Sequence, residues 1–152
     1  MTIPMTTAYL VAITATGVFL LIGLMTGVWK YLGIRASAEA KAHYYVDVAH
    51  RASLMYSFAA LVIAEFTKLT GFSDFLNTWL VSIQIYFFAT AILFYIVHGV
   101  LKDTDNQLRV PHVLGKGTVS QPMMSMLLWA LVVGELGGFS VMFAGFVNTH
   151  LI

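Results

Sequence analysis

The chain has 152 residues, of which 59% are hydrophobic and 10% are charged, and its formal net charge is +1. Such an apolar composition excludes an ordinary soluble domain, and the near-zero charge gives no reason to expect a nucleic-acid partner. The sequence contains no cysteine, which excludes disulfide bonds, thiolate-held clusters, a cysteine nucleophile and thioether-attached haem. Any metal or redox centre must therefore use nitrogen and oxygen ligands.

Four apolar blocks follow one another along the chain, at residues 9–29, 48–66, 79–101 and 123–147. Each is close to the roughly 20 residues that a helix needs to cross a bilayer. Runs such as VFLLIGLM do not alternate polar and apolar residues, as the strands of a membrane β-barrel do. The sequence therefore predicts an all-α integral membrane four-helix bundle, with residues 1–152 in one membrane domain.

The basic residues gather on one side of these predicted spans. Seven flank or lie in the two long connections, and they are Lys30, Arg35, Lys41, Arg51, Lys102, Arg109 and Lys116. Only Lys68 falls on the other side. The first block has no basic segment before it and no small-residue cleavage site after it, so we expect a retained span. The positive-inside rule then predicts a multi-pass protein of a bacterial-type inner membrane, with both long connections in the cytoplasm.

The three connections differ in their composition. The first, RASAEAKAHYYVDVAH, has good helix formers and could hold a short interfacial helix. A tight turn around Gly71 and Asp74 makes the second and third helices antiparallel neighbours. Residues 102–121 contain DTDN, a proline and two glycines, which predict an irregular cap over the cytoplasmic end.

Small residues indicate where helices approach closely. Gly23 and Gly27 on the first helix, and Gly134 and Gly138 on the fourth, form small-xxx-small pairs that serve equally for packing within a subunit or between subunits. Four helices make a thin bundle, in which a pocket is easier to build between subunits than inside one. We therefore expect a homo-oligomer.

Several polar residues should converge near the cytoplasmic side. His50 begins the second helix and His98 ends the third, while Tyr95 shares a face with His98 and Tyr56 lies deeper than His50. His50 has apolar sequence on one side, and imidazole is the best haem or metal ligand in a chain without cysteine. His98 is either a second axial ligand or an interfacial histidine that stabilises the negative end of a helix dipole.

Other polar residues near the membrane have structural as well as functional interpretations. His43, Asp47 and His50 fall on one helical stripe, yet we interpret the first two as solvated boundary residues. Glu135 lies midway along the fourth helix, where a carboxyl group is a functional candidate unless a partner such as Gln84 satisfies it.

With the dipeptide AH at the entrance of the second helix and Tyr95 late in the third, the chain resembles the styrene oxide isomerase family. These are small four-helix membrane proteins that bind haem b. The resemblance implies a trimer in which His50 is the axial ligand and Tyr95 a catalytic residue. Tyr56 stands where the family has an asparagine that helps to hold the substrate, so the substrate or the reaction can differ.

The resemblance also implies a reaction, the Meinwald rearrangement of a small apolar epoxide to an aldehyde or ketone. Ferric haem b on His50 would act as a Lewis acid on the epoxide oxygen, without net electron transfer. Tyr95 would bind that oxygen or orient the intermediate, and Tyr56 would take part of the role of the missing asparagine. Hydroxylaminobenzene mutases, small isomerases of similar hydropathy, are a related possibility.

Three other functions fit parts of the pattern. A cytochrome b-like electron carrier would use His50 and His98 as paired axial ligands. A non-haem metal enzyme would use His43, Asp47 and His50, although these residues spread over about 10 Å of a straight helix. The third is a structural subunit of a larger membrane complex, without a cofactor.

Overall fold

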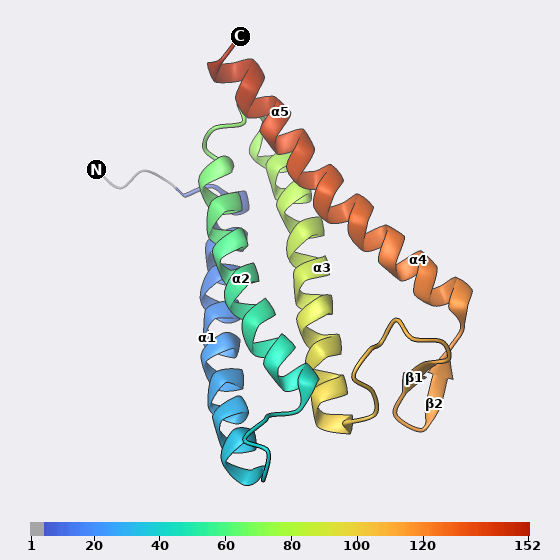
Figure 1. Cartoon of the computed structure of the whole chain (residues 1–152). Coiled ribbons are helices and arrows are strands. Elements are labelled where there is room, and N and C mark those ends of the chain that lie inside the picture. Colours follow the sequence, from blue (N-terminus) through green and yellow to red (C-terminus); the bar gives the residue numbers. More distant parts are fainter. Residues whose placement is uncertain (1–4) are drawn as a thin grey trace.

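The computed structural model describes residues 5–152 and is almost entirely helical (Figure 1). Its elements are α1 (Thr7–Ala36), α2 (Tyr44–Phe66), α3 (Asp74–Leu101), β1 (His112–Leu114), β2 (Gly117–Val119), α4 (Gln121–Val132), the π-helical turn η1 (Val133–Gly137) and α5 (Gly138–His150). The last three run on without a break as one long helix. In this part of the chain, four helices are long and apolar enough to cross a membrane, which confirms the predicted all-α bundle and is typical of a membrane protein.

Three of the helices form the packed part of the bundle. Small side chains let α1 and α2 approach each other closely, as at Ala12 and Ala60, which are fully buried. On α3, Val81 and Ile92 complete this core. Large apolar side chains such as Leu24 are instead exposed on the outside of the bundle, as expected for helices whose outer face meets lipid rather than water.

The glycine pairs of the sequence both serve contacts within this chain. A Cβ atom at Gly23 would lie 2.6 Å from the Leu54 side chain, and one at Gly27 would lie 2.9 Å from the His50 ring. On the fourth helix, Gly138 leaves room for Gln84 in the same way. The structure thus shows the packing interpretation for both pairs.

The turn between α2 and α3 is held by buried side-chain hydrogen bonds. Asn77 donates to the carbonyl oxygen of Thr67 at 3.1 Å, and its own carbonyl oxygen accepts from the Thr70 hydroxyl at 3.0 Å. Gly71 has a φ of +70°, which favours glycine. The predicted turn is therefore present, and the hydrogen bonds of Asn77 explain its compactness.

The fourth helix packs at one end only. Figure 1 shows α5 against α3, whereas α4 leans away from the bundle toward the β1–β2 hairpin. The α4 segment has no buried residue. At Gly134 the backbone packs closely on α3, because a Cβ atom there would clash with the Phe87 ring. An open groove therefore lies between α4 and the pair formed by α2 and α3.

Each of the two long connections differs from the sequence interpretation. The interfacial helix that the first connection could hold is absent, because α1 continues to Ala36 and α2 begins at Tyr44, leaving residues 37–43 without a helix. The second carries a two-stranded hairpin in which His112 pairs with Val119. Both connections lie at the same end of the bundle (Figure 1), called the loop end below.

Candidate functional site

Two cavities lie along the α2–α3 side that faces the groove beside α4. The first, of about 440 Å³, lies at the loop end and is lined by Tyr45 and Tyr95 and by loop residues 105–109. The second, of about 580 Å³, lies deeper, where Phe88 and Glu135 are among the lining residues. Residues of α2 and α3 line both cavities, and those of α3, Phe88 and Tyr95, are seven positions apart and share one face of the helix.

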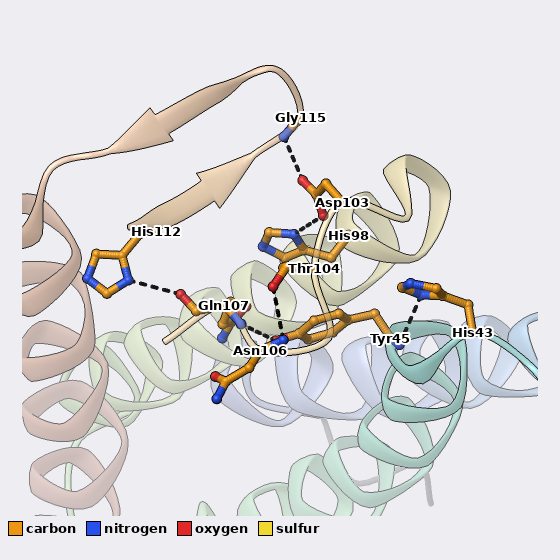
Figure 2. A network of polar contacts seen from close by, with 9 residues as sticks. All are labelled: His43, Tyr45, His98, Asp103, Thr104, Asn106, Gln107, His112 and Gly115. Atoms are coloured by element: carbon orange, nitrogen blue, oxygen red, sulfur yellow. Dashed lines mark hydrogen bonds and ion pairs between the residues drawn. The ribbon is translucent and has the colours of Figure 1, made fainter. Parts of the chain in front are cut away.

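A network of polar contacts closes the loop end (Figure 2). His98 donates a hydrogen bond from Nδ1 to the Asp103 carboxylate at 2.8 Å, and both side chains are almost completely buried. The other carboxylate oxygen of Asp103 accepts the Gly115 N–H of the hairpin. Gln107 donates its backbone N–H to the Tyr45 hydroxyl at 2.6 Å. These bonds attach the long connection to the ends of α2 and α3.

The electrostatic balance at Asp103 favours its charged form. Burial raises the pKa of the carboxyl group, but the hydrogen bonds from Gly115 and His98 outweigh burial and hold that pKa below its ordinary value. His98 is thus engaged in fastening the loop and packs against the Tyr45 ring at a centroid distance of 4.9 Å. This geometry agrees with the structural interpretation of His98, at the end of α3.

His50 has different surroundings, in the seam between α1 and α2. Its Nδ1 donates a hydrogen bond to the carbonyl oxygen of Gly23 at 2.8 Å, so the neutral ring carries its free lone pair on Nε2. Gly27 leaves the space that the ring occupies. The side chain is half-buried. Such an arrangement, with one ring nitrogen fixed by a carbonyl group and the other free, is typical of metal-ligating histidines.

Charged residues lie one turn from His50. Asp47 forms ion pairs with Lys30 at 2.6 Å and with Arg51 at 2.8 Å. His43 caps the start of α2, where its Nδ1 accepts the N–H of Tyr45 at 3.3 Å. Asp47 therefore pairs with basic side chains rather than orienting an imidazole, in agreement with the interpretation of Asp47 and His43 as boundary residues.

The two predicted tyrosines lie away from His50 in this chain. Tyr56 stacks on Phe88 of α3 at a centroid distance of 4.4 Å, and Tyr95 stacks on Tyr45 at 6.1 Å. Tyr56 lies six positions after His50, so the two side chains point about 120° apart around the axis of α2. His50 consequently contacts α1, whereas both tyrosines lie on the side of the groove.

Glu135 has no partner of the kind expected from the sequence. Gln84 donates its amide to the Leu80 carbonyl oxygen at 3.0 Å and to the Met142 sulfur at 3.5 Å, not to Glu135. Among residues 5–152, the Oε1 atom of Glu135 is buried without a hydrogen-bond partner. Gln84, the possible partner considered from the sequence, thus forms no hydrogen bond with Glu135.

Sequence reasoning also missed residues that the structure brings into the loop-end network. Asp103 belongs to the DTDN cluster, and Tyr45 to the stretch AHYYV. Their buried contacts depend on how residues 102–120 fold back over the bundle. The sequence feature that could have indicated these contacts is the DTDN cluster, which follows His98 at the end of a helix. Asp and Asn side chains in turns often accept hydrogen bonds from backbone N–H groups.

The described residues do not assemble a non-haem metal site. Within residues 5–152, no three histidine or acidic side chains are grouped closely enough to hold a metal ion, so the combination of His43, Asp47 and His50 lacks the required geometry. Comparisons with protein-family models, with curated proteins and with solved structures found no match to this chain. Functional inference therefore depends on the residues themselves.

Proposed function

We propose that this protein is a membrane isomerase that uses ferric haem b, held by His50, to rearrange a small apolar epoxide to an aldehyde or ketone. The observation that carries the proposal is the His50 imidazole, with Nδ1 bonded to Gly23 and its ring seated over Gly27. Such a histidine would hold the haem iron, because the carbonyl group fixes the tautomer and leaves the lone pair on Nε2 free. The resemblance to styrene oxide isomerases supports the same assignment.

With haem b in place, the chemistry supplied is Lewis acidity toward the epoxide oxygen. Tyr95 would donate a hydrogen bond to that oxygen, and Tyr56 would orient the aromatic or alkyl part of the substrate. The apolar walls beside Phe88 would exclude water, which otherwise opens an epoxide to a diol. One C–O bond breaks and a hydride moves to the neighbouring carbon, so no co-substrate is required. The bilayer would deliver the substrate.

The separation of His50 from the tyrosines supports an oligomeric enzyme. His50 occupies the α1–α2 seam, and Tyr56 and Tyr95 occupy the groove side of the same chain. When two different faces of a subunit meet head to tail, the assembly closes into a ring if the rotation permits. A homo-oligomer, a trimer by the family resemblance, would then place His50 of one subunit beside the groove of the next.

The electron-carrier alternative receives less support from the geometry. A second histidine ligand would have to be His98, whose side chain is 4% exposed and donates to Asp103. Ligation by His98 would require the loop-end network to open. A hydroxylaminobenzene-type mutase remains an isomerase alternative, because Tyr56 replaces the family asparagine and no described contact fixes the substrate.

The proposal is tested by the visible absorption spectrum of the detergent-purified protein, with pyridine haemochrome analysis. We expect a ferric high-spin Soret band that disappears in His50→Ala and persists in His98→Ala, together with conversion of styrene oxide to phenylacetaldehyde that Tyr95→Phe reduces about 100-fold. A low-spin band that needs both histidines would favour electron transfer. Protein without haem after reconstitution would overturn both functions.

A further inference from the structure

The deeper cavity contains an unsatisfied acid that the proposed haem chemistry does not use. Glu135 lies in the π-helical turn η1, in the middle of the fourth membrane-length helix. Its Oε1 atom is buried and has no hydrogen-bond partner within residues 5–152. A buried carboxyl oxygen without a partner is costly, and π-helical turns are frequent at functional sites. Glu135 is therefore a candidate binding group for a ligand of this cavity.

The cavity walls indicate the chemistry of that ligand. Three phenylalanines, Phe58, Phe88 and Phe139, line the same space of about 580 Å³ as Glu135. Aromatic faces attract cations, and a carboxylate in apolar surroundings needs a positive partner. The lining residues include no lysine, arginine or histidine that could supply this charge. A ligand that brings its own positive charge satisfies both the acid and the aromatic walls.

The size and the entrance of the cavity set two further conditions. A volume of about 580 Å³ accommodates a small aromatic molecule. The groove opens where α4 leaves the bundle, and the side chains of Phe58 and Leu136 at this opening are 69% and 67% exposed. In a membrane this opening faces lipid, so the ligand must partition into the bilayer.

We propose that the cleft between α2, α3 and η1 is a binding site for a lipophilic ammonium ion, an aryl-alkyl amine in its protonated form. The ammonium group donates hydrogen bonds to the Glu135 carboxylate, and the aryl group packs against the phenylalanines. Gln84, buried at the same wall, adds a polar group beside the ammonium ion. Glu135 has no role in the haem proposal, and His50 lies in the α1–α2 seam and does not line this cavity. The two proposals share only the wall at Phe88.

The test compares a cation with a neutral analogue of similar size. The full-length protein in detergent is titrated at pH 7 with 2-phenylethylamine and with 2-phenylethanol, and binding is measured by isothermal titration calorimetry. We expect the amine to bind at least about tenfold more tightly than the alcohol, since a charge-assisted bond to a buried carboxylate contributes about that factor or more. Equal affinities, or no binding of the amine, would overturn the proposal.

Variants assign the binding to this carboxyl group. Glu135→Gln should weaken amine binding about ten- to hundredfold and leave the alcohol unchanged. The matched control is Glu65→Gln, because Glu65 is an exposed acid of α2 that pairs with Lys68 at 2.7 Å outside the cleft. Glu65→Gln should retain the affinity of the wild-type protein for the amine. If Glu135→Gln retained it too, the acid would not be the binding group.

A third variant keeps the proposal testable if Glu135→Gln does not fold. Ala59 lines the cleft, and Ala59→Leu fills part of its volume without altering the acid. We expect this variant to lose binding of both ligands, whereas unchanged binding would place the amine elsewhere. His50→Ala should abolish haem binding but not amine binding, so that failure of one proposal is distinguishable from failure of the other.

Discussion

The imidazole of His50 donates a hydrogen bond to the carbonyl oxygen of Gly23, with 2.8 Å between Nδ1 and that oxygen. The acceptor is a backbone carbonyl group of α1, which in a regular helix bonds only to an N–H group of the same helix. The bond from His50 therefore joins two membrane-length helices. The ring can take this position because Gly27 carries no side chain, whereas Gly23 leaves room for Leu54. Helix packing and the orientation of His50 are therefore one structural feature.

The first prediction concerns Gly27→Ala. The new Cβ atom would lie 2.9 Å from Cε1 of His50, so the ring must shift. We expect the affinity for haem to fall about tenfold or more, as when the outer contacts of a metal-ligating histidine are altered. The measurement is a haem titration of the apoprotein, followed at the Soret band. Gly17→Ala on the same helix is the control, because a Cβ atom there has no neighbour within 4 Å. Equal affinities of the two variants would show that the ring position does not depend on Gly27.

The membrane helices could be predicted from the sequence, but their true ends could not. A membrane-crossing helix needs an apolar block as long as the bilayer is thick, so counting such blocks predicts the number of long helices. The described chain has the predicted four. The block at residues 9–29 underestimates α1, which runs from Thr7 to Ala36. The extra turns contain polar residues such as Arg35. Hydropathy assigns such residues to a loop, although arginine is a good helix former.

The site was harder to predict because contacts between helices depend on rotation about each helix axis. Sequence spacing placed His50 and His98 at similar depth, but it could not tell that one meets the backbone of α1 and the other meets Asp103. Glu135 was recognised as unusual from its position alone. Whether Gln84 satisfies it depends on the side-chain orientation, and the amide turns toward Leu80 and Met142 instead.

The second prediction concerns the pH dependence that Asp103 produces. The pKa of Asp103 is lowered in the folded protein, so its contribution to stability is fully present above the ordinary pKa of an aspartate, about 4. That contribution is lost as the pH falls through the lowered value. Asp103→Asn should lower the free energy of unfolding by about 1–2 kcal/mol near pH 7. The stability of the variant should also fall less than that of the wild type as the pH is lowered. The measurement is thermal unfolding at pH values from about 3 to about 7, a range that includes the ordinary pKa of an aspartate. Asp105→Asn is the control.

Asp105 is an appropriate control because it belongs to the same loop. Its ion pair with Arg109 is exposed, with both side chains 66% accessible, and such pairs contribute little to stability. If Asp103→Asn and Asp105→Asn had the same unfolding profile, the buried His98–Asp103 bond would not stabilise the loop end.

The third prediction concerns the turn between α2 and α3. Asn77→Ala removes the donor to Thr67 and the acceptor for Thr70, and it leaves buried polar groups without partners. We expect the free energy of unfolding to fall by about 1–3 kcal/mol, measured by denaturant unfolding in detergent micelles. Asn148→Ala, at an exposed asparagine of α5, should change it by less than about 0.5 kcal/mol. A stable Asn77→Ala variant would show that water replaces the lost bonds.

The fourth prediction concerns the contact that holds α5 against the α2–α3 turn. A Cβ atom at Gly145 would lie 2.8 Å from the carbonyl oxygen of Thr70 and 2.6 Å from the Phe72 ring. The carbonyl group cannot move freely, because it also accepts a hydrogen bond from Thr149 at 3.2 Å. Gly145→Ala should therefore destabilise the protein by about 1–3 kcal/mol, as overpacking does.

Gly137→Ala provides the comparison within the same long helix. A Cβ atom at Gly137 meets nothing within 4 Å, so this variant should be unchanged or more stable by up to about 1 kcal/mol, because alanine restricts the unfolded chain. Detachment of α5 in Gly145→Ala would also expose the backbone near Thr70, which hydrogen exchange of residues 67–73 detects directly. Wild-type exchange in this segment would mean that α5 is not held at Gly145, and that its position comes from the contacts of Gly134 and Gly138 with α3 instead.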